Sequence, residues 1–326
     1  MNLLNVPSNQ KVAVVTGGWS RERDRSLASA EAVLGALDEL GLKAKTVDLE
    51  ADRATLATDL GGADVALLAI AGQGAEDGVL QGFLETLGIP YTGSGVLTSA
   101  LGMNKIAAKE TVRPFILYMA PDCKFNPSAP VQPQVDIVEE EMPYPVIVKP
   151  LSEGGSIGVA LARNRDELTA AISASDSAEL MVEGYVKGVS VSVGVLDGTE
   201  GPVALSPLET EALGGSIYSS EAKQVPGQAQ YHCPARLSET ALNALRRVSL
   251  TAHRALGCSG FSLHDFVVDE HDHPYWLEVN TLPGLTRNGS LARMAEADGI
   301  SYPQLIAHIL AGASVRRPAT STRSAA

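Results

Sequence analysis

Apolar and polar positions follow two different periods along the N-terminal third of the chain. "KVAVVTGG", residues 11–18, is an apolar run that stops at two glycines, which is typical of a buried strand. Residues 26–40 then repeat apolar positions at helical spacing up to Gly41, and "KAKTVDL" and "VALLAIAG" predict two further strands. This alternation predicts a parallel sheet covered by helices, in a doubly wound domain that ends near residue 98.

The rest of the chain changes to a different pattern. After a predicted helix from Ser99 to Glu110 come a Pro-rich loop, the strand "YPVIVKP", a glycine-rich turn, a short strand, and a helix from Arg165 to Ser173. "ELMVEGYVKG" and "VSVSVGVLD" alternate apolar and polar residues as antiparallel strands do, and a helix near residues 238–256 precedes two more strands. A small central domain and an α+β C-terminal domain are therefore expected.

The predicted fold class is α/β and α+β, with three domains and a tail. The last residues are small, polar and basic with nothing to bury, which is typical of disorder. The predicted ranges are 1–98 for the doubly wound N-terminal domain, 99–187 for the central domain, 188–313 for the C-terminal antiparallel-sheet domain, and 314–326 for the disordered tail.

Composition excludes some classes of function. The chain has 326 residues and a formal net charge of -13, which argues against a generic nucleic-acid binder. No apolar run approaches the roughly 20 residues that span a bilayer, and the start lacks the pattern of a signal peptide, so a cytoplasmic protein without membrane partners is expected. The three cysteines are too few and too far apart to indicate a disulfide framework or a Cys-rich zinc site.

Acidic residues gather in "HDFVVDEHDHPYWLEVN", residues 264–280, which predicts two strands joined by a polar turn. If the turn is the four residues 270–273, Asp265 lies directly opposite Glu278, whereas a five-residue turn would break this parity. Asn280 projects from the same face as Glu278 because side chains alternate along a strand. Like charges placed opposite one another destabilise a sheet, and Mg²⁺ or Mn²⁺ with oxygen ligands would remove that cost. The alternative is a solvated sheet face, and the "HDH" turn indicates a solvated turn rather than a zinc site.

A magnesium ion held by few carboxylates takes its other ligands from water and phosphates, so phosphate binders are expected nearby. Lys149 ends a predicted strand and leads into "PLSEGGSIG", whose glycines allow backbone N–H groups to approach an anion. Lys105 opens a predicted helix, and Lys223 lies in the polar loop "SSEAKQVPG". Each lysine alone is typical of an ordinary surface charge. Neither a Walker A sequence nor GxGxxG is present.

"GGSIG", residues 154–158, also matches the GxSxG nucleophile elbow of serine hydrolases, which would make Ser156 a nucleophile. The elbow requires a strand entering and a helix leaving. Here four residues separate Lys149 from Gly154, and "VALA" follows as a strand, so this hypothesis is disfavoured.

Several motifs taken in order carry a family resemblance: "VVTGGWSRERDRSL", "GAEDGVLQGFLETLGIPYTGSGV", "ALGMNK", "PVIVKP", "EGGSIGV", "EAK", "QYHCPA" and "YWLEVNTLPGLT". Together they resemble the D-alanine:D-alanine ligases of the ATP-grasp superfamily over roughly residues 11–312. The resemblance implies an ATP-grasp fold and an ADP-forming carboxylate–amine ligase. In such an enzyme a carboxylate takes the γ-phosphate of ATP to form an acyl phosphate, which an amine then attacks to give an amide.

The resemblance also implies site residues. Phosphates of ATP would contact Lys105, Lys149 and, from a mobile loop, Lys223. The adenine would be held by Glu183 and the backbone of Gly184, Tyr185 and Val186, and the ribose position of the family aligns with Ser190. Two Mg²⁺ ions would bind to Asp265, Glu278 and Asn280. Glu22, in "SRERD", matches the acid that holds the first amino acid's ammonium group.

Substrate-facing positions depart from the family repeatedly. Ala71 stands where the family has a histidine, Gln224 where it has a tyrosine, and Leu263 where it has an arginine. Gly155 and Gly289 each stand where the family has a serine, with Ser156 and Ser290 beside them. Metal and phosphate positions are kept, so the pattern favours an altered substrate over lost activity. Arg287 or His264 would have to supply the missing arginine's positive charge.

The sequence therefore predicts an ATP-dependent ligase that joins or cyclises amino-acid-like substrates other than D-alanine, in specialised metabolism. One alternative is an authentic D-alanine:D-alanine ligase of peptidoglycan synthesis. Another, from a different class, is a nucleotide-binding protein without catalysis. The expected partners are small amino-acid-like molecules, and the family resemblance suggests a homodimer.

Overall fold

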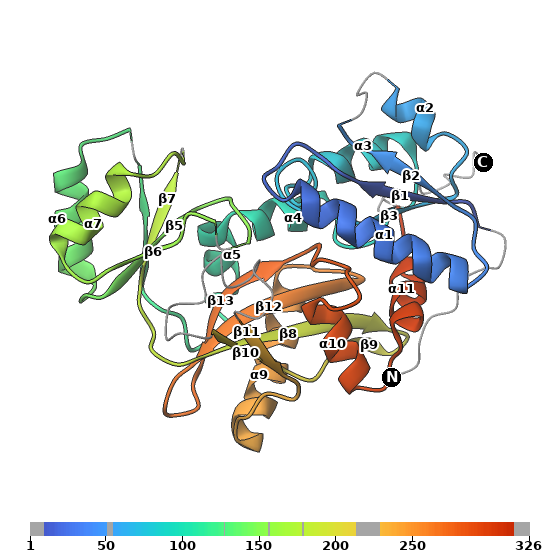
Figure 1. The fold of residues 1–326 in the computed structure, drawn as a ribbon. Helices are drawn as coiled ribbons and strands as arrows, with labels where there is room; N and C mark the ends of the chain where they lie inside the picture. Colours follow the sequence, from blue (N-terminus) through green and yellow to red (C-terminus); the bar gives the residue numbers. More distant parts are fainter. Residues whose placement is uncertain are drawn as a thin grey trace, which may run out of the picture.

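The structure, a computed structural model, describes residues 10–50, 55–126, 128–155, 157–177, 179–212 and 229–315. Three sheets occupy three successive parts of the chain (Figure 1). Each sheet falls within one of the three predicted domain ranges, while the boundaries themselves stay predictions. Ser156, Lys223, Gln224 and residues 316–326 of the predicted tail lie outside the described residues.

The N-terminal sheet is parallel, with strand order β2-β1-β3. Its strands are β1 (Val12–Thr16), β2 (Ala44–Asp48) and β3 (Val65–Leu68), connected by α1 (Arg23–Glu39) and α2 (Leu56–Leu60). All five residues of β1 are buried. The predicted strands and the first helix are confirmed, and the helix begins three residues earlier than the sequence pattern indicates.

The strand order determines where this domain can bind a ligand. Because β1 lies between β2 and β3, the loops that leave the carboxyl ends of β1 and β3 open side by side. In parallel α/β sheets such a switch point is the usual ligand crevice. The two loops are residues 17–22 and 69–78, and the second leads into α3 (Val79–Leu87).

The single helix predicted from Ser99 to Glu110 is two helices, α4 (Val96–Met103) and α5 (Lys105–Val112). The chain breaks at Asn104, whose backbone is extended and whose side chain accepts a hydrogen bond from the Ala107 N–H. Asparagine favours such N-cap positions because its side chain replaces a missing helical acceptor. The break makes Lys105 the first residue of α5.

The central sheet is antiparallel, with strand order β4-β7-β5-β6. Its strands are β4 (Asp122–Phe125), β5 (Val146–Pro150), β6 (Ala160–Ala162) and β7 (Leu180–Gly184). The helices α6 (Val131–Glu141) and α7 (Arg165–Ser173) pack on it and share its core, as the left of Figure 1 shows. The predicted α7 begins and ends where the sequence pattern places it.

The C-terminal sheet has strand order β11-β10-β8-β12-β13, and β9 pairs with β8. Its strands are β8 (Val189–Gly198), β9 (Gly201–Ala204), β10 (Leu208–Ala212), β11 (Ala229–His232), β12 (Phe261–Val268) and β13 (Pro274–Asn280). All its pairings are antiparallel, as predicted, and α9 (Glu239–Ala255) packs against it.

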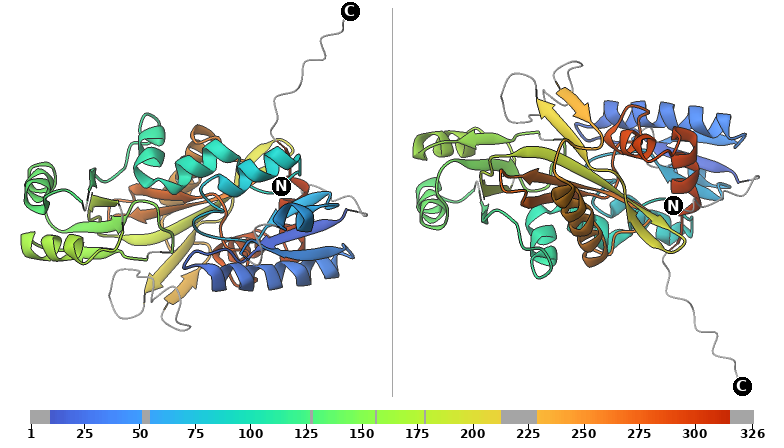
Figure 2. Two further views of the ribbon diagram at one scale, coloured as in Figure 1. Left: turned by 90° about the horizontal axis from the view of Figure 1, so that it is seen from above. Right: turned by 90° about the horizontal axis from the view of Figure 1, so that it is seen from below.

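The last two helices return to the N-terminal domain. α10 (Ser290–Ala297) and α11 (Tyr302–Ala311) contribute to the same core cluster as β1 and α1, and Figure 2 shows them in red beside the blue N-terminal elements. Ser314 then forms an isolated bridge with Tyr91, so the chain is still anchored where the predicted tail begins. Among the described helices, none is long and apolar enough to cross a membrane.

Candidate active site

The hairpin of β12 and β13 places Asp265 directly opposite Glu278, which confirms the predicted pairing. The predicted turn length is wrong, however, because Val268 pairs with Pro274 and the turn therefore has five residues. A shift in register between Asp265 and Phe266 offsets the extra turn residue. This β-bulge restores the parity that a five-residue turn alone would break.

One face of this hairpin is polar and open to a cavity, while the other is buried. Leu263 and Asp265 line the cavity, whereas His264 lies in the core. Ser192 of β8 donates a hydrogen bond of 2.5 Å to Asp265, and Lys105 lies 3.4 Å from Glu278.

Asn280 also lines the cavity, on the face of β13 that carries Glu278. Two carboxylates and an amide oxygen are the hard donors that Mg²⁺ or Mn²⁺ prefers, so this donor set fits the predicted metal.

The cavity has a volume of about 650 Å³ and is lined by residues of the central and C-terminal sheets, of α1 and the loop after β3 in the N-terminal domain, and of the N-terminus of α10. Most of the predicted site residues that the structure describes lie in its wall. They are Glu22, Lys105, Lys149, Glu183, Gly184, Tyr185, Val186, Ser190, Asp265, Glu278 and Asn280.

A buried network of ion pairs forms the wall beneath the predicted nucleotide position. Lys149 on β5 contacts one oxygen of Glu183 at 2.7 Å, and Lys109 on α5 contacts the other oxygen. Lys109 also lies 3.2 Å from Asp122 on β4. Burial by itself lowers the pKa of Lys149, but the carboxylates of Glu183 and Glu278 outweigh it, so the pKa lies above its ordinary value. Lys149 is therefore charged at neutral pH.

These contacts give Glu183 a role within the protein beside the adenine contact that the family resemblance implies. Each of its oxygens accepts a hydrogen bond from a lysine, so Glu183 holds Lys149 and Lys109 in position. Sequence reasoning missed Lys109 and Asp122. The sequence gives little signal for them, because Asp122 faces Glu183 through the strand β4, which overlaps the start of the predicted Pro-rich loop.

Other groups that are predicted to contact the nucleotide also form hydrogen bonds within the protein. The backbone N–H groups of Gly184 and Tyr185 donate to the carbonyls of Pro121 and Pro145, at 2.9 and 3.1 Å. Lys105 donates a 2.5 Å hydrogen bond to the carbonyl of Glu153, at the start of the glycine-rich turn. This bond brings the helix α5 and the turn together at the predicted phosphate position.

The opposite end of the cavity is built by the two switch-point loops of the N-terminal domain. Glu22 is the N-cap residue of α1 and is almost fully buried. Glu76, which follows β3, accepts a 2.6 Å hydrogen bond from the N–H of Gly72 through one oxygen. Its other oxygen is buried without a hydrogen-bond partner. Burial, followed by the negative charge of Glu22, raises the pKa of Glu76 to about 8.

The raised pKa of Glu76 predicts a pH-dependent stability. The unfolded carboxyl titrates near 4.5 and the folded one near 8, so the stabilisation is full below pH 4.5 and is lost as the pH rises through 8. From pH 5 to pH 8.5 the free energy of unfolding of the wild type should fall by about 2 to 5 kcal/mol more than that of a Glu76→Gln variant. Urea unfolding of both proteins at the two pH values measures the difference.

A matched control is Glu31→Gln, which removes an exposed carboxylate from α1. Its pH dependence should follow the wild type within error. Equal pH dependence of the Glu76→Gln variant and the wild type would show that Glu76 ionises normally.

The positions that depart from the family pattern and that the structure describes face the same cavity. Leu263, Ala71 and Gly155 all line it. Gly289 is the N-cap residue of α10, and a Cβ there would lie 3.0 Å from the Thr286 hydroxyl oxygen, so a side chain would be crowded. The adjoining Ser290 also lines the cavity and offers a hydroxyl at this helix N-terminus.

The structure does not bring Arg287 or His264 to the substrate end. Arg287 contacts Glu39 at the end of α1 and lies over the ring of Tyr302, away from the cavity lining. His264 points to the opposite face of β12, where Ser262 and the Trp276 indole bond its ring nitrogens. Burial lowers its pKa to about 3, so it carries no positive charge near neutral pH. Neither residue replaces the missing arginine.

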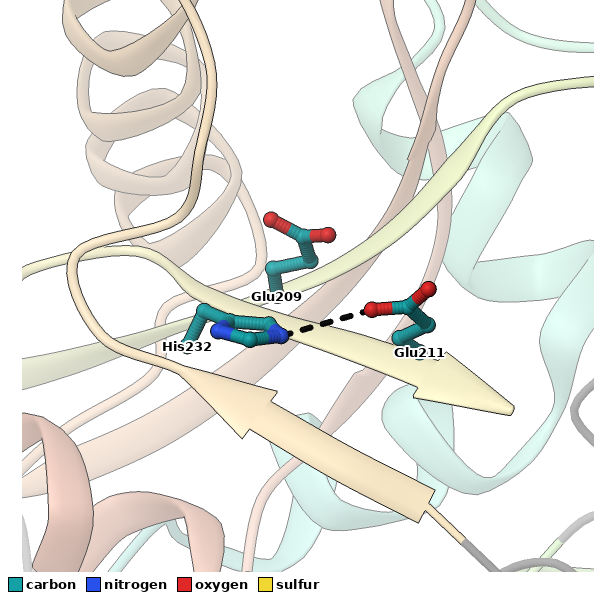
Figure 3. A group of neighbouring side chains, drawn as sticks. All are labelled: Glu209, Glu211 and His232. Carbon is teal, nitrogen blue, oxygen red and sulfur yellow. Dashed lines mark ion pairs between the residues drawn. The ribbon is translucent and has the colours of Figure 1, made fainter. Parts of the chain in front are cut away.

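A separate group of carboxylate and imidazole donors lies on β10 and β11. Glu209, Glu211 and His232 bring their donor atoms within 4.8 Å of one another, and Figure 3 shows His232 directed at Glu211. Arg236 contacts both glutamates, at 2.5 and 2.7 Å, and lowers the pKa of each. Since Arg236 pairs with both acids, these side chains form an ion-pair cluster that ties β10 and β11 together.

Comparisons with known proteins agree with this arrangement. Residues 112–311 match the family model described as D-ala D-ala ligase C-terminus. The D-alanine--D-alanine ligase of Geotalea uraniireducens is 40% identical over 313 residues, which cover 94% of this chain and 96% of the relative. The corresponding ligase of Geobacter sulfurreducens is 40% identical over 310 residues, covering 94% and 95%.

Solved structures are similar over nearly the whole chain. The D-alanine--D-alanine ligase of Bacillus anthracis complexed with ATP gives a TM-score of 0.79 at 27% identity, and the match covers 93% of this chain and 97% of that one. The VanG D-Ala:D-Ser ligase of Enterococcus faecalis gives a TM-score of 0.78 at 25% identity, covering 92% and 98%.

The three-sheet fold and a cavity that joins lysines, glycine turn and paired acids define an ATP-grasp ligase, an enzyme class that forms ADP as it joins two substrates. Within that class, the chain belongs to the D-alanine--D-alanine ligase family.

Proposed function

We propose that this enzyme joins two molecules of D-alanine into D-alanyl-D-alanine, converting ATP to ADP and phosphate. The observation that carries the proposal is the 40% identity to D-alanine--D-alanine ligases over 94% of the chain. It is supported by one cavity that is lined by Glu22, by Lys105 and Lys149, and by the acidic hairpin.

The proposed roles rest on the family resemblance, and the position of each described residue in the cavity supports them. Lys105 and Lys149 bind the phosphates of ATP, and Glu22 binds the ammonium group of the first amino acid. Lys223 is proposed to reach the γ-phosphate as well, a role that rests on the family resemblance. We also propose that Asp265, Glu278 and Asn280 hold Mg²⁺ or Mn²⁺, which would neutralise negative charge on the phosphates when bound.

The reaction proceeds in two balanced steps. A carboxylate oxygen of the first D-alanine bonds to the γ-phosphorus, and the bond from that phosphorus to the β-phosphate oxygen breaks, releasing ADP. The amine of the second D-alanine then attacks the carbonyl carbon of the acyl phosphate. Phosphate leaves, the amine gives up a proton, and an amide remains. Positive charge around the transferring phosphoryl group lowers the barrier of the first step.

A second candidate is a ligase for a different amino acid, as the sequence pattern favours. One observation supports it: Leu263, Ala71 and Gly155 all face the cavity, where the family resemblance predicts polar side chains. The relatives favour D-alanine, and the two candidates differ only in substrate.

Release of ADP across a panel of D- and L-amino acids, singly and in pairs with Mg-ATP, separates the candidates. D-alanine should give the highest turnover, and mass spectrometry should identify D-alanyl-D-alanine as the main product. Turnover with other amino acids but not with D-alanine would overturn the proposal in favour of the second candidate. Failure of every amino acid to stimulate ADP release would indicate a nucleotide-binding protein instead.

A further inference from the structure

An ion pair between Glu22 and Arg25 lies in the cavity wall at the start of α1. A guanidinium nitrogen of Arg25 donates a 2.6 Å hydrogen bond to the Glu22 carboxylate. The Glu22 side chain is 6% exposed, whereas that of Arg25 is 49% exposed. Arg25 therefore holds the buried acid with one edge and presents the rest of its guanidinium to the cavity.

Helix stability does not explain an arginine at this position. Arg25 lies in the first turn of α1, where the unpaired N–H groups and the helix dipole favour acidic side chains and disfavour cations. The i,i+3 contact with Glu22 offsets part of that cost.

Arg25 is also the cation available at the substrate end. Among the described residues that line the cavity, the positively charged side chains are Arg25, Lys105 and Lys149. Both lysines are held at the nucleotide end by their contacts with Glu278 and Glu183. The wall contributed by the N-terminal domain thus has one described cation, and the cavity must accept the negative carboxylate of an amino acid.

The glycine-rich turn lies directly against the ion pair. A Cβ on Gly154 would lie 2.7 Å from the Glu22 carboxylate, and one on Gly155 would lie 2.9 Å from the Arg25 guanidinium. Arg25 therefore occupies the space that a side chain at position 155 would need. A carboxylate bound to Arg25 would also lie beside the turn that Lys105 ties to the predicted phosphate position.

Glu76 supplies an independent sign that a ligand belongs here. Its outer oxygen is buried, lacks a hydrogen-bond partner and belongs to a residue of the cavity wall. A buried carboxyl oxygen without a partner costs free energy that an ammonium group in the cavity would recover, and the positive charge of the ammonium would also favour the ionised form of Glu76. The Glu22 and Glu76 carboxyl groups for an ammonium, and Arg25 for a carboxylate, thus lie side by side.

We propose that Arg25 binds the carboxylate of the amino acid whose ammonium group Glu22 binds, so that the pair forms a receptor for a zwitterionic α-amino acid. The ammonium group of the amino acid then lies against Glu22 and its carboxylate against Arg25, beside the contact between the two residues. The inference rests on the proposed function in that the ligand is an amino acid, and it makes Arg25 a specificity-determining residue of the first-substrate pocket.

The test compares D-alanine with D-alaninamide, which keeps the ammonium group and replaces the carboxylate by a neutral amide. Calorimetry with Mg-ADP present measures both affinities for the wild type, Arg25→Gln, Arg25→Lys and the control Arg21→Gln. Gln keeps a donor for Glu22 without the charge, and Lys keeps the charge. Arg21 lies four residues earlier, pairs with the exposed Asp176 and does not line the cavity.

The wild type and the control should bind D-alanine roughly 10- to 100-fold more tightly than the amide, since a charge-assisted hydrogen bond is lost. Arg25→Gln should lose this preference, and Arg25→Lys should keep part of it. In steady-state assays, Arg25→Gln should raise the KM for the amino acid by a similar factor and leave the KM for ATP unchanged.

An undiminished preference for the carboxylate in Arg25→Gln would overturn the inference while leaving the proposed function intact. If a different amino acid is the substrate, the same comparison with that amino acid and its amide decides the role of Arg25, although the proposed function fails. If the wild type binds no amino acid of the panel, both fail.

Discussion

Replacement of Glu278 by glutamine should remove ATP turnover almost completely while the protein folds normally. Glu278 is the acid opposite Asp265, and the two carboxylates with Asn280 form the proposed metal site. The loss of one carboxylate charge should weaken metal binding and lower kcat by at least about 100-fold, since the metal would neutralise negative charge on the transferring phosphoryl group. Folding is spared because the side chain is 28% exposed and its removal relieves repulsion with Asp265.

The measurement is ADP release, combined with urea unfolding of the same preparation. Glu270→Gln is the control, because Glu270 belongs to the same hairpin but is 87% exposed in the turn. Its turnover should equal that of the wild type. Normal turnover by Glu278→Gln would remove Glu278 from the metal site.

Replacement of Glu183 by glutamine should instead destabilise the whole protein. The Glu183 carboxylate neutralises Lys149 and Lys109, and all three side chains are buried. A buried charge that loses its partner costs about 3 to 5 kcal/mol, and the denaturation midpoint in urea should fall accordingly. ATP binding should weaken as well, because Lys149 loses the group that holds it in position.

Two further variants make this test specific. Glu179→Gln removes a surface carboxylate just before β7 that pairs with Lys124, so it should change stability by less than about 1 kcal/mol. The double variant Glu183→Gln, Lys109→Met should be less destabilised than the sum of its single variants, since it removes a charge of each sign. Additive effects, or a stable Glu183→Gln protein, would contradict the proposed network.

The sequence was sufficient for features that depend on local pattern. The parallel sheet, α7 and the acidic hairpin follow from periodicities of apolar residues, and the structure contains them. The pairing of Asp265 with Glu278 was predicted correctly, although the predicted turn was one residue too short. The β-bulge shifts the register by one residue and so cancels the effect of the longer turn. The bulge interrupts the alternation of buried and partly exposed residues at Leu277 and Glu278, whereas the prediction counts residues along two regular strands.

Features that depend on packing between domains could not be predicted. Arg287 is close in sequence to cavity residues, yet the docking of its loop against α1 directs it to Glu39. Lys109 resembles a surface residue in a helical pattern, because its significance comes from Glu183, which another part of the fold brings into place. Arg25 and Glu22 are only three residues apart, but the glycine-rich turn that lies against them belongs to the central part of the chain. The break at Asn104 is different, because it is a local N-cap to Ala107 that the helical spacing of the surrounding apolar residues does not show.

The central claim is that this enzyme activates the carboxylate of D-alanine with ATP, and an isotope experiment tests it most directly. D-alanine labelled with ¹⁸O at both carboxylate oxygens is incubated with the enzyme and Mg-ATP, and the phosphate and the amino-acid product are analysed by mass spectrometry. If an acyl phosphate forms, each phosphate released carries one heavy oxygen, in step with D-alanyl-D-alanine that has lost one. Phosphate without the label, accompanied by unchanged D-alanine, would mean that water cleaves ATP and that the chain is not a D-alanine ligase.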